Sequence, residues 1–318
     1  MITRTYQEVY AEAMELYGKH EYGEVYNVLT REAELYPDDA TEIIYLRSCM
    51  AARQGDNALA IALLREALDK GIWYGEQVMR MSPSWEALQG LPEFEEVAAR
   101  AKALENEANL SPHLFIQEPA HGSSGDQPRP VVLALHGNNS QGEQTLHGWR
   151  ALAEQGWLLA AAQSSQALTS NAYIWDNQEV AQREIREHYA TLRDGHNVDP
   201  SRVLIAGFSM GGETALRAAL QGTIPVKGFV LLGPGGPTID TPDAWLPLLP
   251  EAKKRGLRGY IFLGERDDTV PHEEIRKLAA LLNEHGIPCE LEVVPDIVHD
   301  YPADFGPHIA RALSFVMD

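Results

Sequence analysis

The sequence predicts an α/β domain with a mostly parallel central sheet flanked by helices, preceded by an all-α helical-repeat domain. From residue 131 onward, short apolar runs alternate with helical stretches, which is typical of parallel strands joined by crossover helices. The first hundred residues instead have apolar residues at spacings of three and four, and no run there reads as a strand. A segment rich in Pro, Gly, Ser and Asp separates the two patterns. We therefore expect a helical domain over residues 1–108 and an α/β domain over residues 109–318.

The helical domain shows an internal repeat. Shifting the chain by 34 positions places Leu29 opposite Leu63 and Arg31 opposite Arg65. A period of 34 residues with two helices per unit resembles the tetratricopeptide repeat (TPR), here over about two units and a degenerate third. Such a TPR-like domain could bind a peptide, form a homo-oligomer, cover the catalytic face or simply bury apolar surface. The sequence leaves these four alternatives open.

Composition and charge exclude several classes of function. A net charge of −20 would repel nucleic acids and anionic lipids, so we expect no nucleic-acid partner. Cys49 and Cys289 lack the C-x-x-C spacing of a zinc site and favour a reducing compartment over a disulfide framework. No stretch approaches the ~20 apolar residues of a membrane span, and the N-terminal residues lack the apolar core of a signal peptide. We expect a soluble, cytoplasmic protein.

Apolar runs and helical patterns predict the elements of the α/β domain. The expected strands lie at residues 131–135, 157–162, 203–206, 228–232, 259–263 and 290–294. The expected helices lie near residues 141–155, 177–195, 210–221, 272–285 and 304–317. Leu114–Glu118 is a candidate edge strand. Functional groups of such a sheet gather at the carboxyl ends of the strands, so the residues that follow each strand are the candidates for a site.

Ser209 lies at the centre of the strongest motif, Gly207-Phe-Ser-Met-Gly211, between a predicted strand and a predicted helix. Gly207 and Gly211 allow a tight turn, because side chains at these positions would collide with the two elements that it joins. The turn would expose the Ser209 hydroxyl. The first N–H groups of the helix, beginning with Met210, would then face an oxyanion beside it. This G-x-S-x-G pattern predicts a serine nucleophile.

Two later strand ends supply a candidate acid and a candidate base. Asp267 and Asp268 both follow the strand at 259–263, where a carboxylate could orient a histidine and stabilise its imidazolium form. His299 follows the strand at 290–294, in the last loop before the terminal helix. The chain order Ser, Asp, His is the order of the triad in proteins with this kind of nucleophile turn.

The loop His136-Gly137-Asn138-Asn139 follows the strand at 131–135 and is a second source of oxyanion donors. A glycine-bearing loop lets backbone N–H groups turn toward the site. We expect the N–H groups of Asn138 and Met210 to form the oxyanion hole. His136 is expected to be a hydrogen-bonded framework residue and not the base.

These motifs together resemble the α/β-hydrolase superfamily, and within it the phospholipase/carboxylesterase group, which borders on dienelactone hydrolase-like enzymes. The resemblance covers residues 112–318 and rests on Leu-His-Gly, Gly-Phe-Ser-Met-Gly-Gly, Gly-Glu-Arg-Asp with Val270-Pro271, and His299. In that group the aspartate stands four residues before the proline of such a Val-Pro pair, which favours Asp267 over Asp268. Dienelactone hydrolases proper carry a cysteine nucleophile, whereas this chain has a serine.

The resemblance also implies a substrate pocket. Gln163-Ser-Ser165 and Trp175-Asp176 resemble segments that line the acyl or alcohol pocket in that group. Gln163, Trp175 and Asn139 are therefore the candidate substrate-binding residues, with packing against the rim as the open alternative. The Pro- and Gly-rich segment 233–250 lies where family members place cap or lid elements, and a packed connection is its alternative.

The function that the resemblance implies is hydrolysis of a small-molecule carboxylic ester with a small or medium acyl group. Ser209 would attack the carbonyl and form an acyl-enzyme, with His299 as base and Asp267 as its partner. We expect no cofactor and no metal, because the histidines show no H-E-x-x-H or comparable spacing. Two alternatives stay open: a serine peptidase or amidase of the same fold, and a binding or scaffold protein led by the helical domain.

Overall fold

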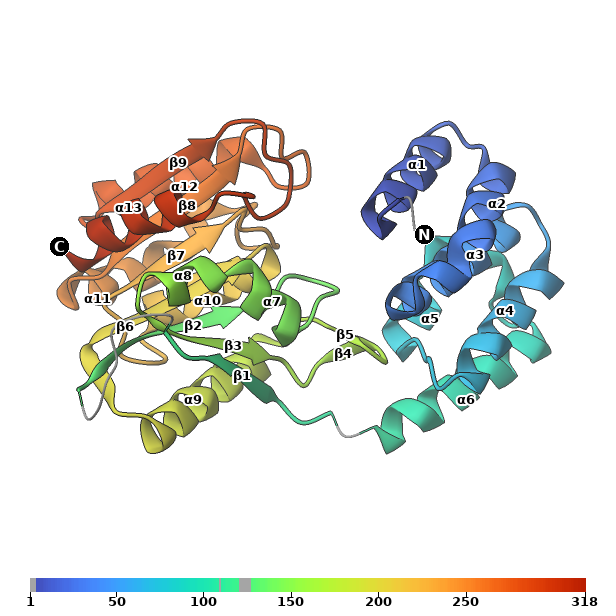
Figure 1. Cartoon of the computed structure of the whole chain (residues 1–318), viewed down its shortest axis with the longest axis horizontal. Coiled ribbons are helices and arrows are strands. Elements are labelled where there is room, and N and C mark those ends of the chain that lie inside the picture. The colour runs from blue at the N-terminus through green and yellow to red at the C-terminus, as the bar shows by residue number, and fades with distance from the viewer. Residues whose placement is uncertain (1–3, 109, 120–126) are drawn as a thin grey trace. The chain divides into compact units, whose positions relative to one another are not determined.

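The computed structural model of the chain describes residues 4–108, 110–119 and 127–318 (Figure 1). The chain divides into two compact units. The first consists of Met1–Asn109 with Ala167–Asn171, and the second of Leu110–Gln166 with Ala172–Asp318. Residues 120–126, the centre of the expected Pro- and Gly-rich loop, lie outside the described residues.

Helices make up the regular structure of the first unit over residues 4–108. They are α1 (Tyr6–Gly18), α2 (Tyr22–Glu32), α3 (Ala40–Arg53), α4 (Asn57–Asp69), α5 (Glu76–Met81) and α6 (Pro92–Glu107), with short 3₁₀ turns η1 (Ala33–Leu35), η2 (Pro37–Asp39) and η3 (Pro83–Leu88). Thr5 and Glu8 form a capping box that begins α1, and the Asp56 carboxylate accepts from the N–H of Leu59 at the start of α4. Consecutive helices from α1 to α4 pack against one another.

Five residues from the second half of the sequence complete the first unit. The N–H of Gly75 donates to the carbonyl of Leu168 at 2.7 Å, and the N–H of Ser170 donates to the carbonyl of Trp73 at 3.0 Å. A boundary drawn at residue 108 leaves these five residues out. Sequence periodicity could not find them, because they form a segment too short to show a pattern.

The second unit is built on a seven-stranded sheet. Its strands are β1 (His113–Gln117), β2 (Arg129–Leu135), β3 (Leu158–Gln163), β6 (Val198–Phe208), β7 (Gly228–Leu232), β8 (Arg258–Gly264) and β9 (Cys289–Val294), in the order β1-β3-β2-β6-β7-β8-β9. β1 pairs antiparallel with β3, and the other neighbours are parallel. This sheet and the preceding helices confirm the predicted fold class, the α/β-hydrolase fold. A separate two-stranded sheet joins β4 (Ala167–Thr169) and β5 (Ala172–Tyr173).

Helices cover both faces of the large sheet (Figure 1). They are α7 (Gly142–Gly148), α8 (Arg150–Glu154), α9 (Gln178–Gly195), α10 (Met210–Gln221), α11 (Leu249–Lys254), α12 (His272–Glu284) and α13 (Gly306–Met317), with the 3₁₀ helix η4 (Pro242–Leu248). The single helix expected near 141–155 is instead two, α7 and α8. The break follows Gly148, where a Cβ would lie 2.4 Å from the ring of Tyr301. α11 lies in a stretch where the sequence predicted no helix.

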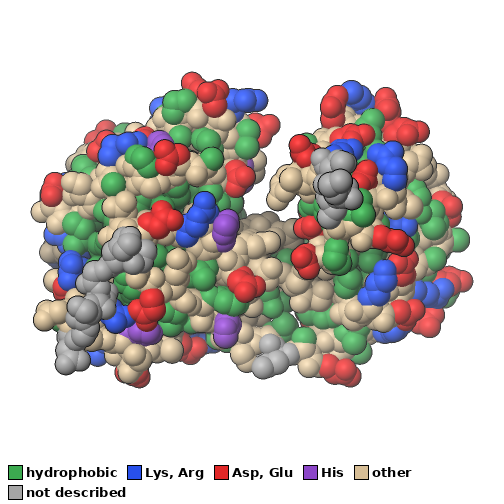
Figure 2. Space-filling view, in the orientation of Figure 1, with side chains coloured by type: hydrophobic (Ala, Val, Ile, Leu, Met, Phe, Trp, Pro, Cys, Tyr) green, Lys and Arg blue, Asp and Glu red, His purple; other side chains and the backbone are tan. Residues whose placement is uncertain are grey.

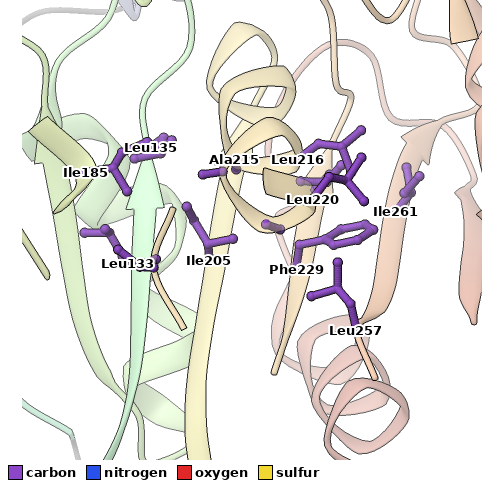
Figure 3. Packing of buried hydrophobic residues seen from close by; sticks show 14 of the residues in the cluster. Leu133, Leu135, Ile185, Ile205, Ala215, Leu216, Leu220, Phe229, Leu257 and Ile261 are labelled. Atoms are coloured by element: carbon purple, nitrogen blue, oxygen red, sulfur yellow. The ribbon is translucent and has the colours of Figure 1, made fainter. Parts of the chain in front are cut away.

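Alternate residues of each central strand pack on opposite faces of the sheet. Leu133 and Leu135 of β2 belong to the apolar cluster that faces α9, α10 and α12, whereas Val132 and Ala134 belong to the cluster that faces α8 and α13. Figure 3 shows the first cluster, in which the side chains of β2, β6 and β7 meet those of α10. Such strands are buried on both faces, which explains why they read as continuous apolar runs.

The strand register brings the expected site residues to one edge of the sheet. Leu135 of β2 is level with Gly207 of β6, and Phe208 is level with Leu232 of β7. Gly264 of β8 is level with Val294 of β9. The loops that follow these strands therefore leave the sheet side by side.

The surface carries many acidic side chains. On the face shown in Figure 2, Asp and Glu are spread among Lys and Arg and do not gather into one patch. None of the helices described in the structure is both long and apolar enough to cross a membrane.

Candidate active site

Ser209 occupies a strained turn between β6 and α10. Its φ is 53° and its ψ −124°, a conformation that L residues rarely adopt. A Cβ at Gly207 would lie 2.2 Å from the carbonyl oxygen of Gly211, and a Cβ at Gly211 would lie 2.2 Å from the carbonyl oxygen of His136. Both positions therefore need glycine because backbone approaches backbone. The turn is held by a hydrogen bond from the N–H of Ser209 to the carbonyl of Leu232 at 3.0 Å.

The candidate acid and base are joined by a hydrogen bond. His299 Nδ1 lies 2.8 Å from Asp267 Oδ2. The other oxygen, Oδ1, accepts from the N–H groups of Thr269 and Val270 at 3.0 and 3.3 Å. A carboxylate with these partners is a hydrogen-bond acceptor, so His299 carries its proton on Nδ1 and leaves Nε2 free to accept one.

Asp267 and Asp268 differ sharply in their surroundings. Asp267 is 4% exposed, and its backbone carbonyl also accepts from His272 Nε2 at 2.7 Å. Asp268 is exposed to solvent. His299 therefore donates its hydrogen bond to the buried carboxylate of the pair.

The segment after β7 lies against the three candidate triad residues. A Cβ at Gly233 would lie 3.0 Å from Asp267 Oδ2 and 3.2 Å from His299 Nδ1. A Cβ at Gly235 would lie 3.8 Å from Ser209 Oγ. The structure thus brings the serine, the histidine and the aspartate together around one short glycine-rich segment.

The candidate oxyanion donors lie on both sides of the nucleophile turn. Met210 is the first residue of α10, so its N–H has no intrahelical partner. The loop after β2 also reaches the turn, because a Cβ at Gly137 would lie 3.4 Å from the Cβ of Ser209. Asn138 and Asn139 follow in an exposed turn, and Asn139 has a φ of 54°.

The buried His136 ring holds the backbone of this loop in place through hydrogen bonds. It is fully buried, its Nδ1 donates to the Gly137 carbonyl at 2.7 Å, and its Nε2 accepts from the N–H of Ser164 at 3.2 Å. Burial lowers its pKa to about 4, so the ring is neutral at physiological pH. The ring cannot serve as the base, because both nitrogens are already paired.

Trp175 and Gln163 contact the framework of the neighbouring loops. Trp175 is fully buried, stacks on the His136 ring at 4.7 Å and donates from Nε1 to the His136 carbonyl at 3.0 Å. Gln163 Oε1 accepts from the N–H of Gly142 at 3.3 Å, at the start of α7. These contacts fit the packing alternative for both residues, since they hold the loop that follows β2 and the start of α7.

Sequence reasoning missed two buried carboxylates beside the site. Glu184 of α9 accepts from the N–H of Ser165 at 3.2 Å and from its hydroxyl. Glu213 of α10 is 4% exposed and accepts from the N–H of Thr238 at 3.0 Å. The available signal was a charged residue at a helix position flanked by apolar or small residues, such as Glu213 between Gly212 and Thr214.

Metal ligands are not clustered in the described part of the chain. There, no group of three or more His, Cys, Asp or Glu side chains could hold a metal ion.

Two family models match the chain. Residues 5–109 match the model described as A/B hydrolase-like, N-terminal domain. Residues 126–249 match the model described as Serine aminopeptidase, S33. No curated protein matches the chain.

Solved structures share its fold. An uncharacterized protein from Bacillus cereus ATCC 10987 is 26% identical, with 99% of this chain and 100% of that chain covered and a TM-score of 0.54. Esterase PE8 is 20% identical, with 63% of this chain and 96% of that chain covered and a TM-score of 0.51. The sheet and the helices on its two faces have the α/β-hydrolase fold, and the two matched models support the α/β-hydrolase superfamily.

Proposed function

We propose that the protein is a serine hydrolase that cleaves carboxylic esters of small or medium acyl substrates through an acyl-enzyme. The observation that carries this proposal is the hydrogen bond between His299 and the buried Asp267, next to a serine held at positive φ. A purely structural role for His299 would not explain the strained serine turn beside it. Strain of this kind costs on the order of 1–3 kcal/mol, which favours a functional reason for keeping it.

In the acylation step, Ser209 Oγ attacks the ester carbonyl carbon while His299 Nε2 takes the hydroxyl proton. The buried Asp267 stabilises the resulting imidazolium, because its second oxygen already accepts two backbone N–H groups and keeps the carboxylate in place. The N–H groups of Asn138 and Met210 would stabilise the oxyanion. His299 then gives its proton to the leaving alcohol, and the acyl group stays on Ser209.

Deacylation repeats these steps with water. His299 Nε2 takes a proton from water, the hydroxide attacks the acyl carbonyl, and Ser209 leaves with the proton that His299 returns. The products are the free acid and regenerated enzyme. All of these steps need only groups that meet at the carboxyl ends of the strands.

A serine peptidase or amidase is the second candidate, and the match of residues 126–249 to the model described as Serine aminopeptidase, S33 favours it. The same triad would serve either reaction. The difference lies in the leaving group, since an amine must be protonated by His299 before it departs.

The test combines covalent labelling with a substrate panel. The full-length protein should label with a fluorophosphonate probe, and labelling should be lost in Ser209→Ala but kept in Ser201→Ala, a matched change at an exposed serine. Aryl esters should be hydrolysed faster than aminoacyl amides. The reverse order would replace the esterase with the peptidase. Absence of labelling in the folded protein would overturn both and favour a binding or scaffold protein.

A further inference from the structure

A buried carboxylate lies one helical turn beyond the nucleophile and is not used in the proposed chemistry. Glu213 is four residues after Ser209 on α10, and its side chain is 5% exposed. Its Oε2 accepts from the N–H of Thr238, and its Oε1 lies 3.6 Å from Arg217 Nη2. Burying a carboxylate is costly unless it is paired, so its position calls for a specific reason.

Arg217 links the carboxylate to the segment that follows β7. Its Nη2 donates to Thr238 Oγ1 at 2.7 Å, and its guanidinium lies over the ring of Trp245 at 4.9 Å. Trp245 itself is fully buried. Glu213 and Arg217 therefore hold the far end of the segment Gly233–Thr238 and the start of the connection to β8.

The backbone of this segment is shaped around the carboxylate. Gly236 has a φ of 141°, and a Cβ there would lie 2.2 Å from Glu213 Oε2. A residue with a side chain would be strained in this conformation and would displace the carboxylate. The carboxylate thus fills the space that the missing side chain leaves open.

Gly235, in the first half of the same segment, lies directly beside the nucleophile. The N–H of Gly235 donates to the carbonyl of Ser209 at 3.1 Å. A Cβ at Gly235 would lie 3.8 Å from Ser209 Oγ and 3.0 Å from Val270 Cγ1. The missing side chain therefore lets Val270 pack directly against the backbone of Gly235, and leaves the side of Ser209 Oγ that faces Gly235 without a methyl group.

We propose that Glu213 is a positioning residue that holds the Gly233–Thr238 segment against the nucleophile turn, and that Gly235 sets the size of the substrate group that fits beside Ser209. The inference rests on the proposed function, since it identifies the residues that would select the substrate at that same site. It accounts for the buried carboxylate and for the glycines at positions 235 and 236 with one arrangement. One of the two groups attached to the scissile carbonyl would pack beside Gly235, on the side that faces Ser209 Oγ.

The first experiment enlarges Gly235. Two ester series are compared, one varying the acyl chain with a fixed alcohol and one varying the alcohol with a fixed acyl group. Gly235→Ala should lower kcat/KM for the longest ester at least tenfold more than for the shortest in one of the two series. Adding Val270→Ala should restore most of that loss, because the new methyl group meets Val270 Cγ1. Gly195→Ala is the matched control, since a Cβ there meets nothing within 4 Å.

The second experiment changes Glu213. Glu213→Leu should shift the ratio of long- to short-chain kcat/KM at least fivefold. Glu213→Gln should restore most of the wild-type ratio, because its amide oxygen can still accept from Thr238. Glu187→Gln, at an exposed position on α9, is the control. A drop in Tm with an unchanged chain-length ratio well below Tm would show a purely structural role and overturn the proposal.

Fluorophosphonate labelling separates this inference from the proposed function. One outcome is that the wild-type protein labels at Ser209 and hydrolyses esters while neither Gly235→Ala nor Glu213→Leu alters chain-length preference. In that case only the inferred roles of Gly235 and Glu213 in substrate selection are wrong. If the wild-type protein does not label, the proposed function itself fails.

Discussion

The ring of Phe208 packs against the imidazole of His299, with ring centroids 4.7 Å apart and an interplanar angle of 32°. The residue that ends β6 therefore contacts the candidate base at the same time as it leads into the candidate nucleophile. The same ring also packs against Tyr301, with ring centroids 5.0 Å apart. Phe208 thus ties the loop that carries His299 to the strand that carries Ser209.

Replacing Phe208 with leucine should weaken catalysis more than stability. Leucine keeps much of the buried volume but loses the flat face that supports the imidazole, and ring pairs of this kind contribute about 0.5–1.5 kcal/mol. We expect kcat to fall about three- to tenfold with KM little changed, as measured on a short aryl ester. Phe315 contacts Arg258 and Tyr260 and not His299, so Phe315→Leu is the control. Equal kinetic losses in the two variants would contradict a role for Phe208 in placing His299.

Asp267→Asn should remove most of the activity while leaving the fold intact. The amide can present its NH₂ to His299, which would move the imidazole proton to Nε2 and leave no acceptor for the Ser209 proton. A loss of kcat of about 10³- to 10⁴-fold is expected. Asp268→Asn alters an exposed side chain and should retain kcat within about twofold. A large loss in Asp268→Asn and a small one in Asp267→Asn would reverse the assignment of the acid.

Ser209→Gly should be more stable than Ser209→Ala although both are inactive. Ser209 adopts φ 53°, which glycine accepts without strain and alanine does not. Relief of this strain, reduced by the greater flexibility of glycine in the unfolded chain, should give Ser209→Gly a free energy of unfolding about 1 kcal/mol higher. Urea unfolding of the two variants measures this difference directly. Equal stabilities would mean that the strain is no larger than the cost of the flexibility of glycine in the unfolded chain, and would contradict the predicted difference.

Burial of His136 should make stability depend on acid pH. Its pKa is lowered to about 4 from an ordinary value of 6.5, and burial likewise lowers the pKa of His188 to about 4. Above pH 6.5 each histidine makes its full contribution to the free energy of unfolding. This contribution is lost as the pH falls toward 4, because the unfolded chain binds protons that the folded chain excludes.

Each histidine should contribute a slope of about 1.4 kcal/mol per pH unit within this window. Urea unfolding at several pH values should therefore show a shallower slope in His136→Gln than in the wild-type protein. His147→Gln, at an exposed position on α7, should keep the wild-type slope. If His136→Gln does not fold, His188→Gln tests the same relationship, and an unaltered slope in the variant that folds would refute it.

The sequence predicted the sheet well because its strands are buried on both faces. β2, β6, β7 and β8 read as continuous apolar runs, and their order in the chain alternates with helices. The break between α7 and α8 follows Gly148, which Tyr301 approaches so closely that a Cβ would not fit, and this contact with a residue more than a hundred positions later could not be predicted from the local sequence. Such breaks depend on tertiary contacts that local periodicity does not record.

Some residues of the candidate site could likewise be predicted from the sequence, and others could not. The residues of the candidate triad could be chosen from sequence because each follows a strand, and strand ends meet at one edge of a parallel sheet. Trp175 is a candidate for contact with substrate because Trp175-Asp176 resembles a pocket segment, whereas its full burial against the His136 ring could be found only from the fold. The sequence signal for Glu213, a charged residue between small residues of a helix, does not identify its partners, because a glutamate in a helix usually faces solvent and only the fold shows what this one contacts.

The five residues 167–171 that complete the helical unit have a consequence for its biosynthesis. A nascent chain that has released only residues 1–108 lacks Leu168 and Ser170, which pair with the backbone of Gly75 and Trp73. The helical unit can form early on the ribosome but reaches its final hydrogen bonding only after residue 171 has emerged. Its maturation is therefore timed by synthesis of the second unit, well after its own last helix has been made.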